Sequence, residues 1–278
     1  MNIIFSNHQL GAVEACHRAE ALRFRAMLRR NTQKSVFMIG SFFHTAMAAH
    51  YSGQDAMALM TEDIKGERNK SSNPEGVSLA GAEAKRLVQW YLETSPEQDA
   101  AIKLSPFAVE NKFSIPIADN AHLVGIIDLV ANACMDGPQS SLGIIDHKTA
   151  SSCGDGYFYG SEYDSQYLLY CHAARTLGFT IDWFAWFVTV KTKTPRSVRH
   201  WLPVNWKRVD SYINRLQLYA NHLEKLPEDI DDILLIPGNP AQCRRCAFRD
   251  MCDYPDNAKW IAENEFHRAD YREFLGED

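Results

Sequence analysis

The sequence has no apolar run that approaches the roughly 20 residues needed to span a bilayer. Its first ten residues also lack the basic-then-apolar pattern of a secretory signal peptide. These two absences predict a cytoplasmic protein with no membrane partner. There is no excess of positive charge either, because 29 Lys and Arg residues against 35 Asp and Glu give a net charge of −6. If the protein binds nucleic acid, it must do so through a local basic groove.

Disulfide bonds are not expected, because the seven cysteines are an odd number in a chain without an export signal. Cys243, Cys246 and Cys252 are closely spaced as C-x₂-C-x₅-C, which predicts metal or cluster ligation. A tetrahedral zinc site or a [4Fe–4S] cluster needs four ligands, and no fourth cysteine lies nearby. The second C-x₂-C pair that is usual in zinc ribbons is also missing. The remaining cysteines are Cys16, far away in the sequence, and Cys134, Cys153 and Cys171, which we expect to be buried free thiols.

Hydrophobic residues make up 46% of the 278 residues, which is enough for the core of one domain spanning residues 1–278. The predicted helices cover residues 9–30, 36–60, 78–94, 161–177 and 205–225, with a polar loop at 65–76 and a helix stop at Gly178. The predicted strands cover residues 107–117, 122–134, 142–149, 181–192 and 197–203, and the first three form an antiparallel meander. The later strand–helix–strand step favours an α/β fold, with a mixed central sheet and helices on both faces.

The part of the chain from Pro227 onward is predicted to be irregular, with the closely spaced cysteines followed by an acidic tail at residues 256–278. The tail could be an oligomer contact, a helix for a partner or a solvated end. Two basic stretches, residues 18–34 and 191–199, could follow a DNA strand or form solvated faces. Their candidate DNA-binding residues are Arg18, Arg25, Lys191, Lys193 and Arg196.

Asp128 and Asp146 each follow an apolar run that predicts a buried strand. Burying a carboxylate costs several kcal/mol unless it is paired or binds a metal. A hard divalent ion such as Mg²⁺ would relieve the repulsion between the two acids, because carboxylate oxygens are its preferred ligands. Lys148 is two residues beyond Asp146, so on a strand both face the same side and Lys148 can orient a nucleophile. The alternative is an ordinary ion pair between Asp146 and Lys148 on an exposed edge.

The Asp146-His147-Lys148 triplet, preceded by Asp128, resembles the motif of the PD-(D/E)XK nuclease superfamily, in its RecB-like branch. The resemblance is strongest to iron–sulfur exonucleases related to CRISPR-adaptation nucleases and to the AddB nuclease domain. It covers roughly residues 6–252 and implies a restriction-endonuclease-like fold. One departure is that this family often has Glu where this chain has Asp146, which shortens the ligand arm by one methylene.

The resemblance also implies roles for residues outside the triplet. Gly40 and His44 are similar to a Gly-x-x-x-His helix in which the histidine is a metal ligand, although alone His44 would more often be a structural residue. Gln166 and Tyr170 match Gln-x-x-x-Tyr, and they share one helix face that in the family touches DNA. Without the family, Tyr170 could be a core residue. Glu110 is similar to a secondary acid near the site.

The implied metal ligands are therefore His44, Asp128, Asp146 and the backbone carbonyl of His147, holding Mg²⁺ or Mn²⁺. The family layout also has one cysteine near the N-terminus and three near the C-terminus that hold a [4Fe–4S] cluster, which makes Cys16 the fourth ligand. A buried thiol at Cys16, or Zn²⁺ in place of the cluster, is the alternative. The cluster-binding region would comprise residues 1–30 and 240–255 and would cross-link the chain ends.

The function implied is a metal-dependent deoxyribonuclease, an exonuclease that acts on DNA ends and prefers single strands. Such enzymes serve DNA repair, recombination or phage DNA processing in bacterial, archaeal or phage-infected cells, with a homo-oligomer or a helicase as a conceivable partner. The alternative is a protein of the same fold that binds DNA or acts as a scaffold without catalysis. The intact set of His44, Asp128, Asp146 and Lys148 favours the enzyme.

Overall fold

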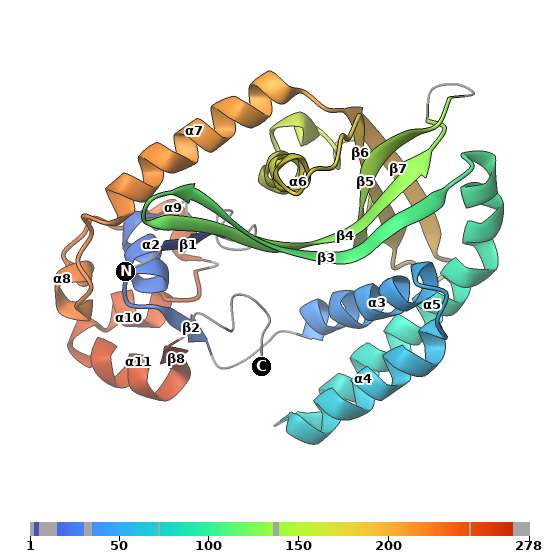
Figure 1. Ribbon diagram of the computed structural model, residues 1–278. Helices are drawn as coiled ribbons and strands as arrows, with labels where there is room; N and C mark the ends of the chain where they lie inside the picture. Colours follow the sequence, from blue (N-terminus) through green and yellow to red (C-terminus); the bar gives the residue numbers. More distant parts are fainter. Residues whose placement is uncertain are drawn as a thin grey trace. The chain divides into compact units, whose positions relative to one another are not determined.

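The computed structural model describes residues 3–5, 16–30, 35–71, 73–135, 139–244 and 246–268 (Figure 1). The chain forms two compact units, each described by itself below. Unit 1 contains Met1–Thr32, Phe113–Gly125 and Trp206–Asp278, and unit 2 contains Gln33–Lys112 and Ile126–Asn205. Across the described ranges, no helix is long and apolar enough to cross a membrane.

The central element is a six-stranded mixed sheet, with strand order β1-β4-β5-β6-β7 and with β3 paired to β4. Its strands are β1 (Ile3–Phe5), β3 (Ser105–Ala118), β4 (Ala121–Ala133), β5 (Ser141–Ala150), β6 (Trp183–Val190) and β7 (Arg196–Pro203). Strands β4–β5 and β6–β7 pair antiparallel, whereas β1–β4 and β5–β6 pair parallel. This arrangement confirms the predicted mixed α/β fold of the restriction-endonuclease-like kind. The three strands predicted between residues 107 and 149 are each present to within two residues.

Strand β6 lies at the centre of unit 2, and all eight of its residues are buried. On one face its side chains Trp183, Ala185 and Phe187 join an apolar cluster with residues of β4 and β5. On the other face, Phe184 and Trp186 contact Tyr167 of α6 (Ser165–Thr176), with ring centroids 5.4 and 6.2 Å apart. Helix α6 connects β5 to the parallel strand β6, as the strand–helix–strand pattern predicted, and Gly178 follows its end with φ of +90°. Tyr51 of α3 (Ser35–Tyr51) packs against the first of these faces and α6 against the second, so the sheet in unit 2 is covered on both faces.

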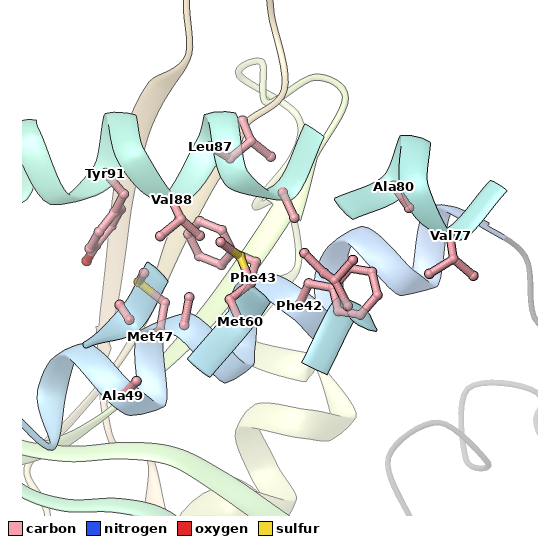
Figure 2. Packing of buried hydrophobic residues seen from close by; sticks show 14 residues of the cluster. Phe42, Phe43, Met47, Ala49, Met60, Val77, Ala80, Leu87, Val88 and Tyr91 are labelled. Atoms are coloured by element: carbon pink, nitrogen blue, oxygen red, sulfur yellow. The ribbon is translucent and has the colours of Figure 1, made fainter. Parts of the chain in front are cut away.

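Three helices of unit 2 form a layer with its own apolar core. They are α3 (Ser35–Tyr51), α4 (Ala56–Lys70) and α5 (Pro74–Ala101). Figure 2 shows side chains from all three, among them Phe43, Met60 and Val88, meeting between the helices. The single helix predicted over residues 36–60 was wrong, because Gly53 adopts φ of +71° and the Asp55 side chain caps a new helix. The loop predicted at 65–76 was also wrong over most of its length, since α4 continues to Lys70 and α5 begins at Pro74.

Among the described residues, unit 1 contains the other α-helices and a two-stranded antiparallel sheet of β2 and β8. Its elements include α2 (His17–Phe24), β2 (Leu28–Arg30), α7 (Trp206–Leu223), α8 (Ile230–Leu234), α9 (Pro240–Cys243), α10 (Arg249–Asp253), α11 (Ala258–Glu265) and β8 (Phe266–Arg268). The prediction that a helix continues to residue 30 was wrong, because Met27 has φ of 57° and the chain then pairs as β2. Residues 9–15 of that predicted helix lie outside the described residues.

The segment predicted as an acidic tail is structured in its first half. Residues 258–268 form α11 and β8, whose buried side chains Ile261, Ala262 and Phe266 belong to the apolar core of unit 1. Burial of these three side chains explains why the segment folds despite its acidic residues. Residues 269–278 of the predicted tail lie outside the described residues.

Candidate active site

Two carboxylates lie next to each other in unit 2 where the regular pairing of β4 and β5 ends. The last register pair joins Leu129 with Ile145, and Asp128 and Asp146 are the next residues on their strands. The Asp146 side chain is fully buried, and that of Asp128 is 10% exposed. Because two buried negative charges repel each other in a medium of low dielectric constant, they require cationic partners or protons.

Lys148 and Gln166 form a closed network with Asp146. Lys148 Nζ lies 2.8 Å from Asp146 Oδ2 and donates a hydrogen bond of 2.5 Å to Gln166 Oε1. Gln166 Nε2 in turn donates to Asp146 Oδ1 at 2.6 Å. Both oxygens of the buried carboxylate therefore have a partner, and the ammonium group is held at one position rather than free to rotate.

Asp164, which belongs to none of the predicted site motifs, positions this network from the start of α6. Its side chain accepts hydrogen bonds from the backbone N–H groups of Gln166 and Tyr167, at 2.8 and 3.2 Å. This is an N-cap, which fixes where the helix begins and so where Gln166 points. The capping rule could have found it, since Asp164 precedes an apolar helical pattern.

His44, Glu110 and Asp128 form a group on the other side of Asp128, and each offers a ligand atom within 4.8 Å of the other two. His44 Nδ1 lies 3.1 Å from Asp128 Oδ2. The same carboxylate oxygen accepts the backbone N–H of His147 at 2.8 Å, which fixes its orientation. Helix α3 and strands β3 and β4 thus bring one histidine nitrogen and carboxylate oxygens together, as in a site for a divalent cation.

Glu110 has an unusual backbone conformation for a residue within a strand. Its φ is 48°, in the left-handed region that side chains other than glycine rarely adopt. Such a conformation costs on the order of 1–3 kcal/mol and persists only where its surroundings fix it. The strain is located at the residue whose carboxylate converges with His44 and Asp128, which supports a functional role for it.

The charges of this centre are strongly perturbed. Burial, assisted by the charge of Asp128, raises the pKa of Glu110 to about 7. Burial also raises the pKa of Asp146 to about 6, despite the nearby Lys148. Burial acts to raise the pKa of Asp128 as well, but His44 and Lys148 hold it below its ordinary value. Burial opposes the charge on His44, yet Asp128 raises the pKa of this imidazole to about 9. The centre therefore contains more acid than its own cations neutralise, and this donor set fits a divalent cation.

His147 lies between the two catalytic candidates in sequence, but its side chain faces an aromatic environment. Its ring is 1% exposed, and neither ring nitrogen has a hydrogen-bond partner among the described residues. The rings around it are Phe43, Tyr51, Tyr91 and Phe187, with centroids 5.5 to 6.4 Å away. Burial lowers the pKa of His147 to about 3, so the imidazole is neutral. A contribution of its backbone carbonyl to metal binding stays a prediction.

Tyr170 lies one helical turn after Gln166 and is 8% exposed. Burial, with the negative charges of Asp146 and Asp128, raises its pKa well above the ordinary value, and its phenol is hydrogen-bonded with Gln166. The phenol therefore keeps its proton beside what we call the acidic centre, which consists of His44, Glu110, Asp128 and Asp146. A cavity of about 480 Å³ gives solvent access to His44 and Glu110, which line it together with other residues of α3, with Leu59 of α4 and with Val109.

The four candidate cluster ligands, Cys16, Cys243, Cys246 and Cys252, form what we call the cysteine group of unit 1. Burial raises the pKa of Cys246, and so do the charges of Cys252, Cys16 and Cys243. The distant Cys16 is thus close enough to Cys246 to act on it electrostatically. All four are half-buried, whereas Cys153 and Cys171 are buried thiols and Cys134 is half-buried.

The candidate DNA-binding residues belong to different units. In unit 1, the Arg18 side chain donates to the Ile236 carbonyl at 2.8 Å, and Arg25 pairs with Glu228 at 2.6 Å. In unit 2, Arg196 donates to the Cys153 carbonyl. Lys191 and Lys193 follow the end of β6, where Lys191 is half-buried and Lys193 is exposed. Apart from these residues, unit 1 contains a second group whose ligand atoms lie within 4.8 Å of one another. This group consists of His17, Glu20 and His222.

Comparisons with known proteins point to one family and one fold. The sequence matches the PD-(D/E)XK nuclease superfamily over residues 4–253. The structure of a "Putative exonuclease" from Eubacterium rectale aligns with a TM-score of 0.53 at 11% identity, covering 90% of this chain and 87% of that chain. At this identity the likeness shows the fold alone. SSO0001 aligns with a TM-score of 0.34 at 12% identity, covering 77% of this chain and 84% of that chain. No curated protein matches.

Proposed function

Because the chain belongs to the PD-(D/E)XK nuclease superfamily, whose members use divalent metals, we propose that it is a Mg²⁺- or Mn²⁺-dependent deoxyribonuclease. The observation that carries this proposal is the convergence of His44, Glu110 and Asp128, with Asp146 and Lys148 adjoining. A protein that only bound DNA would have no need for a buried, partly protonated set of acids. We further propose that it is an exonuclease that acts on DNA ends and prefers single strands.

We assign His44, Asp128, Asp146 and the His147 carbonyl as the residues that hold the metal, with Glu110 as a secondary acid. When bound, the metal supplies Lewis acidity and neutralises charge on the phosphate. Burial of the carboxylates in the sheet gives the site a low dielectric constant, which strengthens each of these interactions. Metal binding would release the proton of His44, whose pKa is raised to about 9, because only a neutral imidazole can be a ligand. Glu110, with a pKa of about 7, would lose the proton that it partly retains.

Lys148 is proposed to orient the nucleophilic water and to stabilise negative charge that develops on the phosphate. Its ammonium group is held by Asp146 at 2.8 Å and by Gln166 at 2.5 Å, so it does not reorganise during the reaction. Its pKa is raised overall, because the attraction of Asp146 and Asp128 outweighs the effect of burial, and it therefore acts as a cation rather than a base. Gln166 and Tyr170 are proposed to border the scissile strand.

The cysteine group is proposed to hold a [4Fe–4S] cluster, as in the RecB-like and AddB-related iron–sulfur nucleases. Cys246 and the three thiols that act on it electrostatically match the number of ligands that either a cluster or a zinc ion needs. When bound, such a group would cross-link α2 to the segment from α9 to α10 within unit 1. Brown colour and visible absorbance after anaerobic purification support the cluster, whereas a colourless protein with stoichiometric zinc excludes it.

A digestion assay with linear and circular single-stranded DNA of the same sequence tests the function and the mode of attack together. We expect the linear strand to be shortened in Mg²⁺ or Mn²⁺, and the circular strand and an equivalent closed duplex to persist. Cleavage of the circle would show an endonuclease and overturn the requirement for ends. If neither substrate is degraded under any metal condition while DNA still binds, the inactive DNA-binding alternative is correct.

A further inference from the structure

Residues 151–164, which we call the tyrosine loop, join β5 to α6 within unit 2 and carry exposed aromatic side chains. Tyr157, Tyr159 and Tyr163 are 44%, 94% and 64% exposed. Among the described residues, only six aromatic side chains are this strongly exposed, and half of them lie in this one short segment. Because large apolar surfaces in water are unfavourable, such a concentration marks a binding surface.

The tyrosine loop is built as a fixed support. Successive turns hold it, with backbone hydrogen bonds such as Tyr157 N to Gly154 O at 2.9 Å and Tyr163 N to Gly160 O at 2.8 Å. Phe158 stacks on His200 of β7, with ring centroids 4.3 Å apart and an interplanar angle of 16°. The loop is thus anchored by Phe158, while the rings on either side of it face solvent.

The tyrosine loop is also adjacent to the acidic centre. It begins three residues after Lys148 on β5, and Asp164 at its end caps the helix that carries Gln166. Burial raises the pKa of Tyr157, and the charges of Lys148 and Asp146 also act on it. A strand bound with a phosphate at the acidic centre would therefore place its neighbouring nucleotides near Tyr157 and the loop that carries it.

The loop's charge decides how it could hold such a strand. It contains no Lys or Arg, but it carries the acids Asp155, Glu162 and Asp164. It therefore repels phosphates, and its tyrosine rings offer flat faces instead. Bases of a single strand expose their faces for stacking on aromatic side chains, whereas bases in a duplex are already stacked on each other.

From this exposure, anchoring and charge, we propose that the tyrosine loop is a stacking platform for the unpaired bases of a DNA strand next to the acidic centre. The proposal rests on the proposed nuclease function and gives a physical cause for its single-strand preference. In this arrangement, different residues contact different parts of the strand. Lys148 and the lysines after β6 interact with the phosphates, and Tyr159 and its neighbours stack on the bases.

Fluorescence anisotropy with labelled oligothymidine in EDTA tests the platform without cleavage. The variants are Tyr159→Ala and Tyr163→Ala, with Tyr159→Phe as the matched control that keeps the ring and Tyr254→Ala as an exposed tyrosine in unit 1. We expect each loop alanine to weaken single-strand binding by at least about fivefold. The two controls should change it by less than twofold, and duplex binding should change little.

The salt dependence distinguishes stacking from charge effects. Because stacking releases no counterions, the slope of log affinity against log salt should be the same in Tyr159→Ala as in the wild type, whereas Lys193→Ala should reduce it. Unchanged affinity in both loop variants, with the wild type cleaving DNA normally, overturns the platform and leaves the nuclease standing. If the wild type fails to cleave but the loop variants still lose single-strand binding, the nuclease function fails and the platform stands.

Discussion

The acidic centre of unit 2 and the cysteine group of unit 1 are both sets of potential metal ligands, but they are built differently. The acidic centre takes single residues from α3, β3, β4 and β5, all parts of a sheet and the helices packed on it. The cysteine group takes three residues from the segment of α9 and α10, helices of four and five residues, and one from the start of α2. Helices that short are unstable on their own.

This difference indicates different purposes. In the acidic centre, burial raises the pKa of Glu110 to about 7 and that of Asp146 to about 6, so the fold maintains charges that are costly without a ligand. In the cysteine group the thiols are half-buried, and they lie on or beside short helices that a shared ligand would cross-link. We therefore expect the first site to control turnover and the second to control stability, and the following predictions test that division.

The largest effect is expected at the acidic centre. Lys148→Ala should lower the rate of DNA hydrolysis by about 10²- to 10³-fold, because it removes the fixed cation beside the reacting phosphate. The rate is measured in single-turnover digestion with saturating metal, and circular dichroism checks folding. Lys70→Ala, at the exposed end of α4, is the control and should be indistinguishable from the wild type. A Lys148→Ala enzyme within threefold of the wild type would remove Lys148 from the mechanism.

Cys246→Ser should lower the stability of the protein and leave its rate of DNA hydrolysis nearly unchanged. We expect the free energy of unfolding to fall by roughly 2–5 kcal/mol, as for loss of a cross-link that closes a long loop, together with loss of visible absorbance. The rate per folded molecule should stay within twofold of the wild type. Cys134→Ser, outside the cysteine group, should change neither quantity by much. Loss of activity in fully folded Cys246→Ser protein would contradict the division between the two sites.

Binding of a divalent metal should stabilise the folded protein only through the acidic centre. Adding Mn²⁺ at about 100 times its Kd to metal-free protein should stabilise it by about 2.7 kcal/mol, seen as a rise in Tm. Asp128→Asn should abolish most of this rise, because it removes a charged ligand at the centre of the group. Cys246→Ser should show the full rise from its lower starting Tm. An equal response in Asp128→Asn and wild type would place the Mn²⁺ elsewhere.

The smallest effect is expected from His147, on the aromatic side of β5. Its pKa is about 3 when folded, against about 6.5 when unfolded, so the unfolded chain takes up a proton that the folded chain does not. Its contribution to stability is complete above pH 6.5 and falls as the pH drops toward 3, by up to about 1.4 kcal/mol per pH unit. The His147→Phe variant keeps an aromatic ring at this position but has no group that takes up a proton, so it should not lose this stability at low pH. The free energy of unfolding of both metal-free proteins is measured with denaturant at pH 7 and pH 5. Between these pH values, the wild type should lose more stability than His147→Phe. An equal loss in the two proteins would contradict a buried, neutral His147 ring.

The sequence predicted β3, β4 and β5 well, because each is rich in Val, Ile and Phe and lies between clear turn residues such as Asp119 and Asn120. It missed the three-residue strands β1, β2 and β8, which are too short to leave a pattern. It failed where one local feature overrides a helical pattern. Gly53 and the Asp55 cap divide one apparent helix into two, and the pairing of β2 with β8 joins residues more than 230 positions apart. Such long-range pairing leaves no periodic signal in either segment.

For the candidate site, the short motif around Asp146 and the family resemblance were enough to choose residues that the fold then brings together. Sequence could not show the φ of 48° at Glu110, the neutral aromatic surroundings of His147 or the exposure of Tyr159. Each of these depends on packing between elements distant in sequence. The cap at Asp164 was within reach, because it follows from a local rule.

The central claim is that the acidic centre hydrolyses DNA with a divalent metal, and the most direct test is a metal add-back experiment on end-labelled single-stranded DNA. Wild-type protein stripped with EDTA should leave the strand intact, and Mg²⁺ or Mn²⁺ should restore its degradation. Asp128→Asn protein, folded and given the same metal, should remain inactive. Degradation that persists in EDTA, or that proceeds equally in Asp128→Asn, would contradict the account.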